Sequence, residues 1–118
     1  MTTVLVSGDR HWHDAAMIFR VLKQYADDTV LIHGAAKGAD AIADAYGRYR
    51  HWTVHREPAL WFEHGRAAGP IRNQRMLTRW QPDVHHAFHD DLNHSKGTRD
   101  MVIRAIAAGV RTYRHCHD

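Results

Sequence analysis

The chain has only one cysteine among its 118 residues, Cys116, so an internal disulfide is excluded. A single thiol is typical of proteins that fold in a reducing compartment, and we expect a cytoplasmic location. Long apolar runs are also missing, which predicts that no segment spans a bilayer and that a membrane is not a partner. The sequence opens on a strand-like segment, so we expect no export signal.

A strong charge of either sign is absent as well. Sixteen Lys and Arg residues against thirteen Asp and Glu residues give a formal net charge of +3. This balance suits an anionic ligand but is too mild to indicate nucleic-acid binding by itself. Repeats and linkers are missing too, and 44% hydrophobic with 25% charged residues is a globular composition. We therefore predict a single domain over residues 1–118.

The most informative stretch is a glycine-containing loop within residues 30–45. Residues 30–33 have the apolar, β-branched character of a short buried strand. Gly34 allows a tight turn, and from Ala39 apolar residues recur at helical spacing. Such a junction directs N–H groups and the positive end of a helix dipole to one point, where an anion can bind. Taken alone, the Gly-x-x-x-Gly loop matches no dinucleotide or P-loop pattern and is most often an ordinary turn.

The rest of the chain alternates strands and helices. Strands are predicted at residues 2–7, 30–33, 51–56, 83–88 and 110–113, and helices follow Asp14, Gly38, Gly69 and Ser95 or Thr98. Residues 57–69 are predicted to be an irregular connection and residues 114–118 a loose tail. The alternation predicts an α/β fold, a single Rossmann-like three-layer domain whose five-stranded parallel sheet has helices on both faces. The expected strand order is 3-2-1-4-5, with right-handed crossovers.

Glycine and basic residues gather in the four loops that lead from a strand to a helix. Six of the eight glycines lie there, namely Gly8, Gly34, Gly38, Gly65, Gly69 and Gly97. The same loops, or the helix starts that follow them, carry Arg10, Lys37, Arg66, Arg72, Lys96 and Arg99. In a parallel sheet all these loops emerge at one edge, which is where ligands of such folds bind. The sequence therefore predicts a site for a phosphate-bearing ligand at this edge.

The predicted ligand-binding residues come from four segments, and they are Gly8, Asp9, Arg10, Gly34, Ala35, Lys37, Gly38, Ala39, Asp40, Gly69, Pro70, Arg72, Asn73, Gly97 and Thr98. Arg72 is the expected anchor, because a cation near a helix N-terminus is unfavourable unless an anion is bound there. For the same reason, its removal is expected to leave folding stability unchanged or slightly raised.

Other members of the set have two interpretations. Asp40 either stabilises the first turn of its own helix or binds a ribose. Asp9 and Arg10 either pair with each other or contact the ligand, and Thr98 can be a helix cap, a phosphate contact or both. Trp12 and Trp61 either stack on a base or pack at the edge of the fold.

The twelve histidines give no metal site. His85 and His86 are adjacent on a predicted strand and therefore point to opposite faces of the sheet. His115 and His117 lie in the expected tail. Since no three ligands share a rigid frame, we predict neither a metal nor a cofactor.

Four strings together resemble a known family: Val6-Ser-Gly-Asp-Arg-x-Trp12, His33-Gly-Ala-Ala-Lys-Gly-Ala-Asp40, Gly65-Arg-Ala-Ala-Gly-Pro-Ile-Arg-Asn-Gln-Arg-Met76 and Lys96-Gly-Thr-Arg-Asp-Met101. They are similar to the YspA, cpYpsA-related SLOG family of small Rossmann-like domains from bacteria and phages. The likeness extends over nearly the whole chain. It implies a nucleotide-derived ligand, because the superfamily includes the LOG phosphoribohydrolases and the DprA single-stranded DNA-binding proteins.

The resemblance to LOG enzymes is incomplete at the residues that matter for catalysis. Arg72 to Met76 resembles the Arg-Lys-x-x-Met string, with Asn73 in the lysine position, and Gly97-Thr98 resembles the Gly-Thr pair. Met101 stands at the position of the LOG glutamate, and Asp100 lies one residue earlier. In an enzyme of this type, Arg72 would bind phosphate or polarise the sugar and Asp100 would supply the carboxylate. The missing glutamate weakens this interpretation, because the transition state needs a fixed negative charge or base.

The leading interpretation is binding or sensing of a nucleotide or nucleotide-derived small molecule at the C-terminal edge of the sheet, and whether the chain is an enzyme stays open. The first alternative is a LOG-like hydrolase that cleaves an N-glycosidic or phosphate bond of a nucleotide. The second is DprA-like single-stranded nucleic-acid binding, which ranks last because it needs stacked aromatics in a basic groove. The resemblance also implies a homo-oligomer, in particular a dimer.

Overall fold

The computed structural model describes all 118 residues and contains one five-stranded, all-parallel sheet of order β3-β2-β1-β4-β5. The strands are β1 (Thr3–Gly8), β2 (Val30–His33), β3 (Thr53–Arg56), β4 (Val84–Phe88) and β5 (Arg111–His115). The helices are α1 (Ala15–Leu22), α2 (Ala39–Tyr49), α3 (Trp61–His64), α4 (Ala68–Trp80) and α5 (Gly97–Ala107), with 3₁₀ turns at Gly65–Ala67 and Leu92–His94. The predicted fold class and strand order are confirmed. No helix has the length and apolar character needed to cross a membrane.

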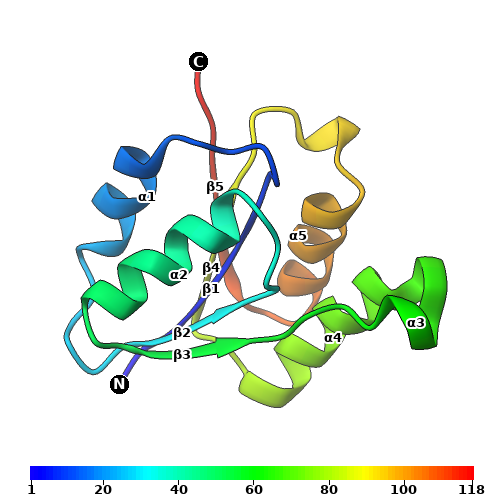
Figure 1. Cartoon of the computed structure of the whole chain (residues 1–118), viewed down its shortest axis with the longest axis horizontal. Coiled ribbons are helices and arrows are strands. Elements are labelled where there is room, and N and C mark those ends of the chain that lie inside the picture. Colours follow the sequence, from blue (N-terminus) through cyan, green and yellow to red (C-terminus); the bar gives the residue numbers. More distant parts are fainter.

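Helices cover both faces of the sheet, with α1 and α2 on one face and α4 and α5 on the other (Figure 1). Successive strand residues alternate between the two cores. Val4 and Val6 pack under α1 and α2, whereas Leu5 packs with Met76 and Met101 of the opposite helices. Because both faces are buried, β1 and β2 are largely apolar, which makes them recognisable in the sequence, whereas the inner strand β4 carries the buried His85 and His86.

The connections after β1 and β4 run to opposite faces of the sheet, since β1 leads to α1 and β4 leads to α5 (Figure 1). These two strands are neighbours in register, with Gly8 opposite Phe88. A Cβ at Gly8 would lie 2.5 Å from the carbonyl oxygen of Phe88 and 2.6 Å from the Cβ of Ala39. Glycine is therefore required where the start of α2 approaches β1. The crevice beyond this pair is the position where ligands of open parallel sheets bind.

The segment before α4 is more regular than the irregular connection expected for residues 57–69. It holds the four-residue helix α3 and the 3₁₀ turn Gly65–Ala67, and α4 begins at Ala68. None of the α3 residues is buried, and the helix projects from the body of the molecule (Figure 1). A helix of about one turn is too short to show an apolar periodicity, so the sequence pattern could not reveal it.

The C-terminal segment is not the loose tail that we expected. β5 continues to His115, and the His117 ring lies 2.8 Å from an Asp14 carboxylate oxygen and 3.0 Å from those of Asp90. The same ring stacks on Trp12 with 4.8 Å between ring centroids. Asp14 also caps α1 as expected, because its carboxylate accepts the N–H of Met17. The partners of His117 are up to 103 residues away in the sequence, so no local pattern predicts these contacts.

Candidate functional site

A cavity of about 520 Å³ opens at the C-terminal edge of the sheet. Its walls come from the ends of β1 and β2, from α2, α4 and α5, and from the loop that joins β4 to α5. It brings together nine of the predicted ligand-binding residues, namely Gly8, Asp9, Arg10, Gly34, Asp40, Arg72, Asn73, Gly97 and Thr98. Segments that are distant in the sequence therefore meet in one cavity, because parallel strands place their following loops at one edge.

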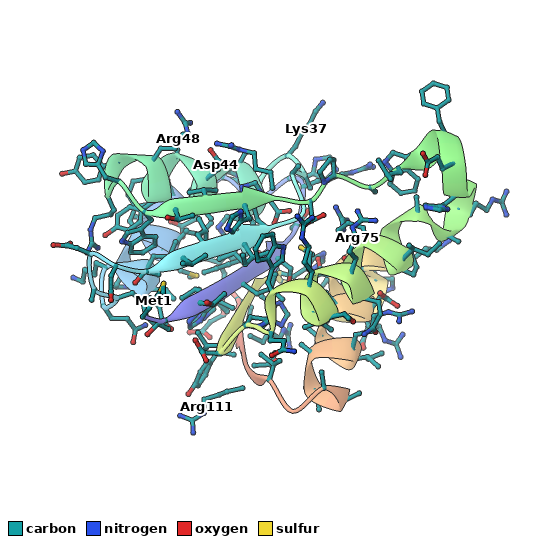
Figure 2. All side chains as sticks on the ribbon, turned by 90° about the horizontal axis from the view of Figure 1, so that it is seen from below. Met1, Lys37, Asp44, Arg48, Arg75 and Arg111 are labelled. Atoms are coloured by element: carbon teal, nitrogen blue, oxygen red, sulfur yellow. The ribbon has the colours of Figure 1, made fainter.

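Other predicted residues lie outside this cavity: Ala35, Lys37, Gly38, Ala39, Gly69, Pro70 and Asp100 do not line it. Lys37 is exposed and points away from the body of the protein (Figure 2). Gly38 supports the cavity from behind, because its backbone packs against the Asp9–Arg10 backbone. The basic residues of the loops thus indicated the edge of the sheet at which the cavity opens, but not which of their side chains line it.

Several further cavity residues were not predicted as ligand contacts, namely Val6, Ser7, His11, Met76, His89, His94, Ser95, Lys96 and Met101. Most of them flank predicted ones in the same loops, so a wider window around each glycine would have found them. Met76 and Met101 give no such signal, because an inward methionine on a helix is normally a core residue.

Asp40 holds the loop after β2 in place. Its Oδ2 accepts the N–H groups of Gly34 at 3.0 Å and Ala36 at 3.3 Å. The side chain is buried, and its Oδ1 has no hydrogen-bond partner. Burial raises the pKa of Asp40, while the nearby His33 and Arg72 act against this rise. Asp40 thus braces the loop and forms part of the cavity wall, while its Oδ1 stays buried without a partner.

Arg72 joins the ends of two strands across the cavity wall. Its Nη1 donates to the carbonyl oxygens of Gly34 and Glu57, and its Nε donates to Asn73 Oδ1 at 2.9 Å. A Cβ at Gly34 would lie 2.5 Å from that Nη1, so glycine makes this approach possible. Burial lowers the pKa of Arg72, and Asp40 opposes that shift. These bonds give Arg72 a structural role, and we now expect its removal to lower stability, in contrast to the sequence-based expectation.

Asp100 connects α4 and α5 outside the cavity. Its Oδ2 accepts from Asn73 Nδ2 at 3.0 Å and from Arg104 Nε at 2.9 Å. The next residue, Met101, turns inward and lines the cavity. The carboxylates that do line the cavity are those of Asp9 and Asp40. The structure thus places the residue expected to supply a catalytic carboxylate away from the space that a ligand would fill.

The loops at the two ends of the cavity are fixed by local hydrogen bonds. Asp9 accepts the His11 N–H at 2.8 Å, and Asp9 and Arg10 form no ion pair with each other. Ser95 caps α5 by accepting the N–H of Thr98 at 3.1 Å, which leaves the buried Thr98 in the cavity wall. Both loops therefore present fixed polar groups to a ligand.

The two tryptophans considered as stacking platforms do not line the cavity. Trp12 is buried in the core and packs edge-on against Phe88, with ring centroids 5.8 Å apart. Trp61 is 60% exposed on the projecting helix α3. No cluster of three or more His, Cys, Asp or Glu residues could hold a metal ion.

Comparison with known proteins identifies the family of this chain. The family described as "YspA, cpYpsA-related SLOG family" matches residues 2–64. The chain belongs to this SLOG family. It is also 35% identical to the Gene 61 protein of Mycobacterium phage D29 over an alignment of 123 positions, which covers 93% of each chain. The expected family is thus confirmed, and a phage relative exists.

The SLOG match includes the residues of one side of the cavity and ends before those of the other side. Residues 2–64 include the loop after β1 and the loop after β2 with Asp40, but the match ends before Arg72 and Gly97. The second half of the site therefore follows from the geometry of this chain, in which α4 and α5 complete the cavity.

The contacts of Asp40 predict that its two simplest substitutions differ in stability. Asp40→Ala leaves the buried N–H of Gly34 and the half-buried N–H of Ala36 without an acceptor and should lower the free energy of unfolding by about 2–3 kcal/mol. Asp40→Asn keeps an oxygen for both N–H groups and should cost less than about 1 kcal/mol. Urea denaturation at pH 7 measures the difference. Equal losses in the two variants would show that the two N–H contacts do not account for the stability that Asp40 contributes.

Proposed function

We propose that this SLOG domain binds a nucleotide or nucleotide-derived small molecule in the cavity at the C-terminal edge of its sheet. The observation that carries the proposal is one cavity at this edge whose wall is formed by three basic residues and by the start of a helix. Arg10, Arg72 and Lys96 line it together with Asp40, whose Oδ1 is buried and unpartnered. A ligand with an anionic end and hydrogen-bond donors elsewhere fits this arrangement.

The phosphate end belongs beside Arg72 and the start of α5. Arg72 uses Nε and Nη1 within the protein, and its Nη2 has no protein partner. α5 begins at Gly97, whose position in the cavity wall brings the positive end of the helix to the ligand. The guanidinium is pre-positioned by its other bonds, so little side-chain entropy is lost when an anion binds.

The geometry favours binding over hydrolysis of such a ligand. The carboxylate expected from the LOG resemblance, Asp100, is bonded to Asn73 and Arg104 outside the cavity. Asp9 and Asp40 do line the cavity, but their carboxylates accept backbone N–H groups of their own loops, so neither stands in for the LOG glutamate as a partner for the charge that develops during N-glycosidic cleavage. Stacking of a single strand is also disfavoured, because the exposed Trp61 and Phe62 project on α3 rather than lining the cavity. A homodimer stays a prediction.

Adenosine 5′-monophosphate is a suitable test molecule, and calorimetry should detect its binding to the wild-type chain. Arg72→Ala should weaken that binding by about 10- to 100-fold, the range for losing a hydrogen bond to a charged group. Arg75→Ala is the matched control, because Arg75 lies one turn along α4, binds Glu57 at 3.0 Å and does not line the cavity. Chromatography of the mixture should recover the nucleotide intact.

A thermal melt of each variant separates binding from folding in this test. We expect Arg72→Ala to melt below the wild type but to remain folded at the temperature of the titration. Equal affinities for wild type and Arg72→Ala would remove Arg72 from the binding site. Absence of binding by the folded wild type, for this and other nucleoside monophosphates, would contradict the proposed function itself.

A further inference from the structure

A serine and a histidine form a close pair at the inner wall of the cavity. Ser7, the penultimate residue of β1, lines the cavity, and its Oγ lies 2.6 Å from Nε2 of His85 on β4. His85 is fully buried behind it. The two residues are 78 positions apart and meet because β1 and β4 are neighbours in the sheet.

A third residue, Thr112, indicates which atom of the Ser7–His85 pair carries the proton of their hydrogen bond. Thr112 uses its only hydroxyl proton to donate to the Val110 carbonyl at 3.1 Å. Its Oγ1, 3.5 Å from His85 Nδ1, can therefore only accept from that nitrogen. We assign the Nδ1–H tautomer to His85, because it satisfies both contacts while Thr112 keeps its bond to Val110, whereas the opposite tautomer would then leave a buried nitrogen without a donor.

In this tautomer Nε2 of His85 is an acceptor, so the Ser7 hydroxyl must donate to it. Burial lowers the pKa of His85 to about 3, which keeps the ring neutral near pH 7. Ser7 has no further proton to give, and no other protein group donates to its oxygen. Toward the cavity, Ser7 is therefore an acceptor only.

An acceptor-only group discriminates between the parts of a ligand. A nucleotide phosphate carries essentially only acceptor oxygens near pH 7, so it is repelled from Ser7 and belongs beside Arg72. A sugar hydroxyl can donate, and leaving Ser7 unpaired in a closed complex would cost binding energy. Asp40 also lines the cavity, and its carboxylate has no proton to donate when it is ionised.

On the basis of the proposed function, we propose that Ser7, oriented by His85, makes the site specific for ligands that present a sugar hydroxyl, that is, for ribonucleotide-type molecules over their dideoxy analogues. Sites built to pair a substrate hydroxyl reject analogues that lack it, because their own polar groups are then left unpaired. Ser7 is thus a specificity-determining residue, while Arg72 supplies affinity for the anionic end.

The experiment compares adenosine 5′-monophosphate with its 2′,3′-dideoxy analogue by calorimetry on the wild type and Ser7→Ala. The wild type should prefer the ribonucleotide by roughly tenfold, the scale of one hydrogen bond. Ser7→Ala should bring the ratio of the two affinities close to one, mainly by weakening the ribonucleotide. Ser7→Thr, which keeps the hydroxyl, should retain the preference. A ratio of affinities is used because it is insensitive to a partial loss of folded protein.

Each outcome has a separate meaning. Equal affinities in the wild type would overturn the inference and leave the proposed function intact, and this result needs no variant to fold. A preference that persists in Ser7→Ala would overturn the assignment to Ser7. Failure of the folded wild type to bind either nucleotide would overturn the proposed function, and the inference with it.

Discussion

Lowering the pH from 7 to 5 should reduce the free energy of unfolding by about 4 kcal/mol, because two histidines are buried in neutral form. Burial lowers the pKa of His85 to about 3 and that of His86 to about 4, against a usual value of 6.5. Between these values and 6.5 the unfolded chain binds protons that the folded chain does not. Stability is therefore full above pH 6.5 and falls as the pH decreases through this window.

The surroundings of the two rings explain why neither accepts a proton easily. His86 lies 2.6 Å from the Tyr25 hydroxyl and 2.8 Å from a ring nitrogen of His115, so a charged His86 would face a second histidine. His117 acts in the opposite direction, since Asp14 and Asp90 raise its pKa, but that ring is solvent-exposed and its contribution is screened. The buried pair should therefore dominate the acid response.

Urea denaturation at pH 7, 6 and 5 measures this response. His86→Gln should be less stable than the wild type at pH 7, yet lose roughly half as much stability on acidification, because one of the two titrating rings is gone. His13→Gln is the control, since His13 is exposed. Its free energy of unfolding should change between pH 7 and pH 5 by the same amount as that of the wild type. A wild-type free energy of unfolding that does not change between pH 7 and pH 5 would refute the assignment of the acid response to the buried His85 and His86.

Gly38→Ala should destabilise the protein by about 3–5 kcal/mol, from backbone strain together with overpacking. Gly38 has a φ of 71°, which side chains with a Cβ rarely adopt. The new Cβ would lie 2.3 Å from the Asp9 carbonyl oxygen and 2.5 Å from the Arg10 carbonyl carbon. Both are backbone atoms, so the loop after β1 would have to move. Since Asp9 and Arg10 line the cavity, nucleotide binding should weaken as well.

Gly97→Ala provides the matched control for this prediction. Gly97 also lines the cavity and opens a helix, but a Cβ there has no neighbour within 4 Å. The change in the free energy of unfolding caused by Gly97→Ala should stay within about 1 kcal/mol. It is stabilising if the higher helix propensity of alanine dominates. Thermal or urea denaturation of the two variants gives the comparison. Similar stabilities would mean that the loop after β1 adapts to a side chain at residue 38.

The two glycines illustrate how the same residue type has different functions at one edge of a sheet. Gly38 is a spacer between the loop after β1 and the start of α2, and it does not itself contact the cavity. Gly97 lies in the cavity wall, where a side chain would meet open space. Glycine-rich loops therefore mark the edge where a ligand binds, but each glycine has to be assigned from the structure.

Local patterns in the sequence were sufficient to predict the architecture of this protein. Buried strands that alternate with amphipathic helices require a parallel sheet, and right-handed crossovers restrict its order, which the structure confirms as β3-β2-β1-β4-β5. The same reasoning predicted that the loops around Gly8, Gly34, Arg72 and Gly97 converge, because loops after parallel strands emerge at one edge. These conclusions depend on local periodicity, which a single sequence contains.

The packing of the elements in three dimensions determines which side chains line the cavity and which hold the fold together. Asp100 and Met101 are adjacent, yet the rotation of α5 places the methionine in the cavity and the carboxylate outside it. The contacts of Ser7 with His85 and of His117 with Asp14 join residues 78 and 103 positions apart. Such contacts are set by the packing of whole elements, and no local pattern in the sequence records the distance between two side chains.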